Sequence, residues 1–151
     1  MASKEKIPPL PHHLGHKPIV SIEYAEHDGP YSSETDAMYI SLGTAQWSDE
    51  EFSAKVWRFV GDRWSRQSEE LPLHRVIDLA ILIAVALRQV KSGLVRFPAN
   101  TFENQKADIH AGVFARFDPP VATQKLLRNR LLALVRTIAS EHPDVMKEAL
   151  K

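Results

Sequence analysis

Glu70, His74 and Asp78 combine the residue types and the spacing best suited to chemistry in this sequence. Each lies four positions from the next, so in a helix all three share one face, roughly 6 Å from each to the next. Two carboxylates and an imidazole can hold a divalent metal ion, or a carboxylate can orient the imidazole for acid–base work. The same residues are also typical of a buried network in which Arg75, His74 or Arg66 satisfies Asp78, and this interpretation is favoured.

A single helix does not bring all three ligands to one ion. Positions i, i+4 and i+8 span about 12 Å along the helix axis. The workable metal site therefore takes His74 and Asp78 from the helix, while Glu69 or Glu70 folds back from the segment before it. Further carboxylates could come from the loop after the first predicted strand, namely Asp28 or Asp36.

Such a site would belong to a metal-assisted hydrolase, which is the alternative function. The cation would generate hydroxide at neutral pH, and Arg66 or Arg75 would bind an anionic substrate through two hydrogen bonds. The sequence has no glycine-rich nucleotide motif and no GxSxG nucleophile motif. It also has no cysteine, which excludes thiol catalysis and cysteine-ligated zinc. A non-enzymatic binding or regulatory module without a cofactor is therefore favoured over the hydrolase with its divalent metal.

Residues 52–67 can be interpreted as a helix or as a β-hairpin. A capping box that begins at Ser48, followed by apolar residues at helical spacing, favours a helix. A Gly-Asp pair that begins at Gly61 suits the centre of a type II′ turn, which would place Phe59 opposite Trp64 in a hairpin. Both structures cannot extend over the whole segment, and the two interpretations stay open at this point.

In the hairpin, Trp57 pairs with Arg66, and both share one face of the sheet with Trp64. Aromatic rings and a guanidinium group on one face could stack on a planar ligand. Tryptophan is most often buried, so packing in the core is the competing interpretation. The predicted ligand-binding residues of the non-enzymatic module are Trp57, Trp64 and Arg66, and its partner would be a protein or a small molecule.

The hydrophobic pattern of the whole chain predicts an α+β fold. Strands are expected at 17–24, 37–42, 94–97 and 109–117. A helix is expected over about 71–90, and its second half is apolar on all sides, as in a helix buried in the centre of a fold. The predicted architecture is a small antiparallel sheet packed on this buried helix and on an amphipathic C-terminal helix of about 120–139. A short terminal helix is expected after Pro143.

Charge is distributed unevenly along the chain, although the net charge is zero. Residues 21–55 are rich in acids, whereas 119–140 contain bases and no acid. The bases are Lys125, Arg128, Arg130 and Arg136. They could bind nucleic acid, but attraction between acidic and basic surfaces of one fold is the favoured explanation. The longest run without polar residues, 79–87, is far shorter than the roughly 20 residues of a membrane-spanning helix, so no membrane partner is expected.

The length of 151 residues and the hydrophobic content of 44% are typical of one globular domain. Residues 1–16 are rich in proline, which predicts an extended N-terminal arm before a single domain over 17–151. The beginning of the chain lacks the apolar stretch of a signal peptide, and the chain lacks cysteine. A cytoplasmic location is therefore expected.

Two blocks of the sequence, TDAMYISLGTAQW and WSRQSEELPLHRVIDLAIL, resemble blocks of an uncharacterised family of small bacterial proteins of unknown function. The resemblance covers about residues 17–90 and leaves the arm and the C-terminal helix unmatched. It implies a bacterial, cytoplasmic source. It implies no activity, substrate or catalytic residue, so the site predictions depend on the residues alone.

Overall fold

The computed structural model describes residues 6–66 and 71–151. The chain divides into two compact units, one that ends at Phe117 and one that begins at Asp118. The first unit contains, in order, β1 (Lys17–Glu23), the short 3-10 helices η1 (Ala25–His27) and η2 (Gly29–Tyr31), β2 (Ala37–Thr44), β3 (Phe52–Val60), β4 (Arg63–Trp64), α1 (Leu73–Gln89), η3 (Val90–Ser92), β5 (Arg96–Phe97), β6 (Ile109–His110) and β7 (Gly112–Val113). The second unit contains α2 (Val121–Glu141) and α3 (Pro143–Ala149).

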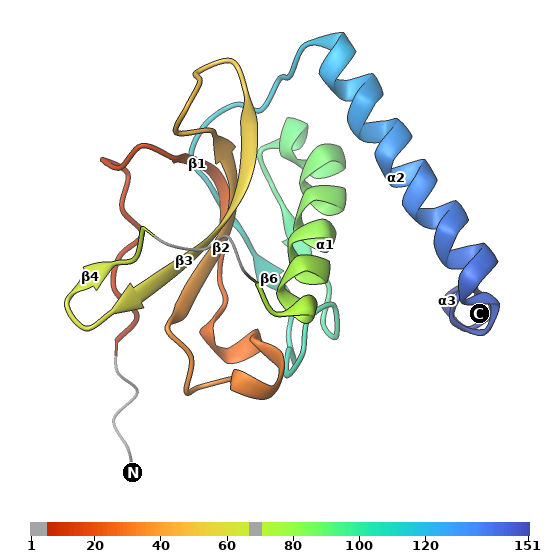
Figure 1. Cartoon of the computed structure of the whole chain (residues 1–151), viewed down its shortest axis with the longest axis horizontal. Helices are drawn as coiled ribbons and strands as arrows, with labels where there is room; N and C mark the ends of the chain where they lie inside the picture. The colour runs from red at the N-terminus through yellow and green to blue at the C-terminus, as the bar shows by residue number, and fades with distance from the viewer. Residues whose placement is uncertain (1–5, 67–70) are drawn as a thin grey trace. The chain divides into compact units, whose positions relative to one another are not determined.

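The first unit is built on an antiparallel sheet with the strand order β4-β3-β2-β1-β7. β5 and β6 form a separate antiparallel pair. Figure 1 shows α1 lying against one face of the large sheet. This arrangement confirms the predicted α+β class and the predicted strands at 17–24 and 37–42, while the two later runs form only the short strands β5, β6 and β7.

Alternate residues of the central strands face opposite sides of the sheet. One set belongs to the apolar core, together with Leu82 and Ala86 of α1, and consists of Val20, Ile22, Ile40, Leu42 and Val56. The other set includes Ser21, Tyr39, Ser41 and Trp57, and we call the side that it occupies the arm face. The apolar face is therefore the one that buries α1, and the polar and aromatic residues collect on the other.

The segment 52–67 is a hairpin in its described part, and the alternative of a helix is wrong. Gly61 has a φ of +67°, and Phe59 pairs with Trp64 as the turn predicted. Residues Phe52 to Arg58 of β3 also pair with the whole length of β2. This long ladder satisfies the backbone of β3 by contacts distant in sequence, which outweigh the helical spacing of its apolar residues.

The helix predicted at 71–90 is present as α1, which packs on the sheet through Leu82 and Ala86 within the first unit. All of α1 is described, and its buried residues are Arg75, Leu82 and Ala86. Ile77 is 61% exposed. A single sheet covers one side of a helix, so the apolar residues that point away from the sheet do not gain the same burial. The predicted cap at Ser68 lies outside the described residues.

The arm docks along the arm face of the sheet. The Tyr39 hydroxyl donates a hydrogen bond to the Pro8 carbonyl (2.7 Å), and the ring of His12 lies edge-on to Phe114 at 4.5 Å between centroids. His16, at the end of the arm, is only 3% exposed. The described part of the arm, 6–16, is therefore part of the packing of the first unit.

In the second unit, α2 confirms the helix predicted at 120–139, and α3 confirms the short helix after Pro143. No residue of α2 is buried. The predicted packing of this helix on the sheet, and a role for its bases Lys125, Arg128, Arg130 and Arg136 in nucleic-acid binding, stay predictions. Within the part of the chain that is described, no helix is long and apolar enough to cross a membrane.

Candidate functional site

A charged network joins the start of α1 to the loop between β1 and β2. Asp28 is fully buried and receives two hydrogen bonds from Arg75, from Nε to Oδ1 at 2.9 Å and from Nη2 to Oδ2 at 2.7 Å. The Nε2 atom of His74 lies 2.8 Å from Asp28 Oδ1. Burial opposes ionisation of Asp28, but the hydrogen bonds from Arg75, Thr35 and His74 hold its pKa below the ordinary value. We call these residues the Asp28 network.

Asp78 has a different partner from the one that the sequence predicted. Tyr24 donates its hydroxyl proton to Asp78 Oδ2 at 2.5 Å. Burial raises the pKa of Asp78, although the hydrogen bond from Tyr24 opposes that shift. Burial, together with the same hydrogen bond, raises the pKa of Tyr24. Asp78 is therefore satisfied by the neutral hydroxyl of Tyr24, the residue that follows β1, rather than by Arg75 or Arg66.

The predicted acid and metal cluster is thus only partly brought together. His74 and Arg75 meet on Asp28, while Asp78 turns to Tyr24. Glu70 lies outside the described residues. Among the residues that are described, no group of three or more histidine, aspartate or glutamate side chains could hold a metal ion. The catalytic and metal-binding roles of these residues stay predictions.

The predicted aromatic ligand site lies on the arm face. Trp57 is 1% exposed, and its indole N–H donates to Ser41 Oγ at 2.8 Å. Trp64 lies 5.8 Å from Trp57 between ring centroids and is half-buried, whereas Arg66 is exposed. Lys55 Nζ lies over the Trp57 ring, 4.2 Å from its centroid. Trp57 therefore offers almost no surface to a ligand, and the ligand-binding role of Trp57, Trp64 and Arg66 stays a prediction.

A chain of neutral hydrogen bonds anchors the end of the arm to the sheet. His16 Nε2 lies 3.0 Å from Ser41 Oγ, and His16 Nδ1 lies 2.9 Å from Ser53 Oγ. Burial, with a smaller effect of the Lys55 charge, lowers the pKa of His16 to about 4. The ring is therefore neutral at pH 7, and it can satisfy both hydroxyl groups without bringing a charge into the protein.

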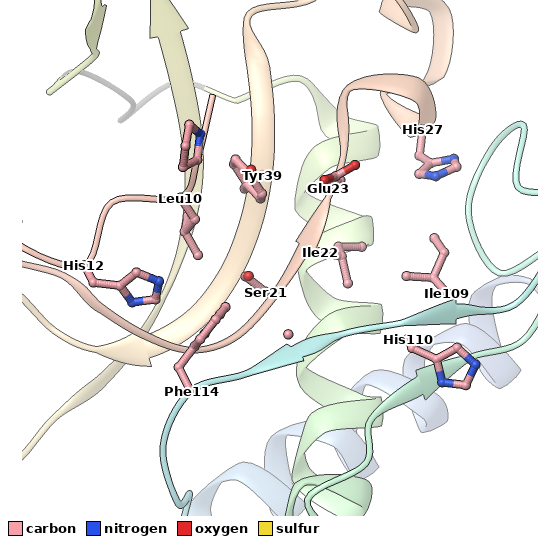
Figure 2. A pocket seen from close by; sticks show the side chains of 12 residues that line it. Leu10, His12, Ser21, Ile22, Glu23, His27, Tyr39, Ile109, His110 and Phe114 are labelled. Atoms are coloured by element: carbon pink, nitrogen blue, oxygen red, sulfur yellow. The ribbon is translucent and has the colours of Figure 1, made fainter. Parts of the chain in front are cut away.

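An open cavity of about 630 Å³ lies between the arm and the sheet, and we call it the arm pocket. Figure 2 shows Leu10 and His12 of the arm on one side and Ile109 and His110 on the other. The described residues that line it come from four separate stretches of the chain. They are Pro9, Leu10, His12, Ser21, Ile22, Glu23, His27, Tyr39, Ile109, His110, Gly112 and Phe114.

The arm pocket exists because the edge of the sheet is incomplete. β7 pairs with only two residues of β1, Val20 and Ser21. Immediately before β7 the chain turns toward β5, since the N–H of Ala111 donates to the carbonyl of Val95 at 2.8 Å. β1 continues past this point through Glu23, so its last residues border an opening instead of a paired strand.

Some of the polar groups that line the arm pocket are already engaged in hydrogen bonds within the protein. The hydroxyl of Tyr39 is bonded to the arm, and His27 Nδ1 lies 2.9 Å from the carbonyl of Glu103. Burial, and then the charge of Glu23, raise the pKa of Tyr39. Sequence reasoning missed this site because its members are far apart along the chain and form no local motif. The one signal in the sequence was the proline-rich arm, because a segment without an apolar core of its own must either stay extended in solvent or pack on the rest of the protein.

These features define an α+β module with a docked N-terminal arm and a cavity beside it. The chain belongs to DUF6530, a family of unknown function, whose model matches residues 9–115. The predicted membership of an uncharacterised family is thereby confirmed, over a longer stretch than the predicted 17–90. The match includes all the residues that line the arm pocket and ends close to Phe117, the last residue of the first unit. No curated protein and no solved structure matches the chain.

Proposed function

We propose that this protein is a non-enzymatic binding module that takes up a small molecule in the arm pocket. The cavity of about 630 Å³ carries this proposal. Small-molecule sites typically measure about 300–1,000 Å³ and combine apolar walls with a few polar groups that orient the ligand. The arm pocket has this character, because Leu10, Ile109 and Phe114 lie among histidines and Glu23.

The Asp28 network, the other candidate site, is less suited to bind a ligand than the arm pocket. Both oxygens of the Asp28 carboxylate are bonded to Arg75, and one of them also to His74. A guanidinium group that already binds a buried carboxylate through two hydrogen bonds is poorly placed to hold an anionic substrate. We therefore assign this network a structural role, which is to fix the loop 25–36 on α1. The arm pocket is then the better candidate for ligand binding.

The proposal includes a bacterial source and a cytoplasmic location, as the resemblance and the absence of cysteine predict. A small molecule is favoured over a protein partner, because the site is a concave cavity rather than a broad flat surface.

The test is a fragment screen on the ¹⁵N-labelled full chain, followed by amide chemical shifts. The fragments are benzene and cyclohexane rings that carry an amino, a hydroxyl or a carboxyl group. We expect at least one fragment to shift the amides of residues 21–23 and 109–114. Ser21→Leu and Ile109→Trp should each weaken that fragment, because both fill the cavity.

The matched control is Ser140→Leu, an equally large change at an exposed position of α2. It should leave fragment binding unchanged. Shifts confined to other parts of the chain, or equal binding by both cavity-filling variants when their melting temperatures show that they are folded, would refute the arm pocket as the site.

A further inference from the structure

We infer that the ligand of the arm pocket is a small organic cation, namely a protonated amine joined to an apolar or aromatic group. This inference rests on the proposed function and specifies its ligand. It follows from the charge of the residues around the cavity, from the open edge of β1, and from the aromatic rings beside that edge.

Glu23 dominates the charge of the arm pocket. Among the described residues that line it, Glu23 is the one acid, and neither a lysine nor an arginine is present. Glu23 is the last residue of β1 and its side chain is exposed. A carboxylate beside a cavity without a fixed positive charge favours a cation over an anion.

The backbone of Glu23 adds an acceptor at the same place. The N–H of Tyr24 donates to the carbonyl of Met38 at 2.8 Å, so Tyr24 directs its backbone groups toward β2. Neighbouring residues of a strand direct their N–H and C=O to opposite edges. The C=O of Glu23 therefore faces the other edge, past the two residues of β1 that β7 pairs with.

An ammonium group fits this pair of acceptors. It has three N–H donors and no acceptor, so it can donate to the Glu23 carboxylate and to the Glu23 carbonyl at the same time. A carboxylate ligand has no donor, so it could form a hydrogen bond with neither of these acceptors. A hydroxyl ligand has one donor and could satisfy only one of them.

Apolar and aromatic side chains line the same cavity as Glu23. Tyr39 and Phe114 line the arm pocket, and Phe114 is 48% exposed. Aromatic faces attract cations through their quadrupole, and Ile109, which is partly exposed, offers contact to a hydrocarbon group. The three histidines, His12, His27 and His110, are the feature that could instead attract an anion, so the experiment includes one.

The experiment compares three probes of equal size at pH 7.5, namely benzylamine, benzyl alcohol and benzoate. Affinities are measured from amide shifts of the ¹⁵N-labelled full chain. We expect benzylamine to shift the amides of residues 21–23 and 109–114 and to bind at least about fivefold more tightly than benzyl alcohol, because its hydrogen bonds are charge-assisted. Benzoate should bind most weakly.

Glu23→Gln keeps the size of the side chain and removes its charge, so the preference for benzylamine over benzyl alcohol should disappear. Glu50→Gln makes the same change at an exposed residue that does not line the arm pocket, and the preference should persist. Tighter binding of benzoate than of benzylamine, or an unchanged preference in Glu23→Gln, would overturn the inference while the arm pocket remains a site. If none of the probes shifts the pocket amides and the wider fragment set also fails, the proposed function falls as well.

Discussion

The two faces of the sheet bury polar groups in opposite ways. On the side of α1, the Asp28 network encloses a charged carboxylate with a guanidinium group and an imidazole. On the arm face, His16, Ser41, Ser53 and Trp57 are joined by hydrogen bonds without a carboxylate. A buried charge requires an opposite charge with good geometry, whereas neutral groups require only hydrogen-bond partners.

This difference has consequences for stability and for function. The Asp28 network connects the loop 25–36 firmly to α1, since losing either partner leaves a charge in the interior. The arm is held by neutral hydrogen bonds, which contribute less and can be broken at lower cost. A ligand site bordered by the arm therefore lies in a part of the first unit that should open at lower cost than the loop 25–36.

The largest effect is expected from Arg75→Ala, which leaves Asp28 buried without its guanidinium partner. Removing one partner of a buried ion pair costs about 3–5 kcal/mol, and this loss should appear in the free energy of unfolding measured with urea. Arg88→Ala is the control, because Arg88 is exposed near the end of the same helix. A loss of less than about 1 kcal/mol in Arg75→Ala would mean that Asp28 is not enclosed as described.

The second effect is a pH dependence that comes from the arm face. The pKa of His16 is about 4 in the folded protein and 6.5 ordinarily, so the unfolded chain binds more protons between these values. Stability from this group is therefore complete above pH 6.5 and is lost as the pH falls toward 4, by an amount on the order of 3 kcal/mol.

His16→Gln should flatten the stability profile between pH 6.5 and 4, while His13→Gln, at an exposed position of the arm, should not. The difference between the two profiles isolates His16 from the carboxylates. Asp28 loses its contribution only at lower pH, because its pKa lies below the ordinary 3.8. Identical profiles for the two variants would show that His16 is not buried as a neutral ring.

A smaller effect is expected from Tyr39→Phe, which removes the hydrogen bond from the Tyr39 hydroxyl to Pro8. The loss should be about 0.5–1.5 kcal/mol, accompanied by faster proteolysis of the arm. Tyr31→Phe removes a hydroxyl from a side chain that is 50% exposed and serves as the control. Equal proteolysis of the two variants would argue that this bond does not hold the arm.

The smallest effect, no shift, is expected from divalent metal ions. His74 and Asp78, the helical ligands of the alternative hydrolase, already have Asp28 and Tyr24 as partners. Zinc or manganese should therefore leave the melting temperature unchanged. A rise that is abolished in His74→Ala would restore the metal site and the hydrolase.

The sequence by itself determined the elements that depend on neighbouring residues. The turn at Gly61 predicted the pairing of Phe59 with Trp64 for one of the two alternatives at 52–67, and the apolar spacing predicted α1 and α2 to within a few residues. Local rules suffice here, because a turn depends on adjacent backbone angles and a helix bonds residues four apart.

Only the tertiary structure decided which residues meet. β3 is a strand because it pairs with β2, Asp78 accepts a hydrogen bond from Tyr24 rather than from Arg75, and α1 packs on the sheet through Leu82 and Ala86. The arm pocket joins residues as distant as Leu10 and Phe114. Such contacts depend on how separate elements pack. The same residue types at the same spacing are compatible with many different packing arrangements, so the sequence pattern does not select one of them. The local pattern therefore predicted the elements, while the long-range contacts selected the partners and formed the cavity.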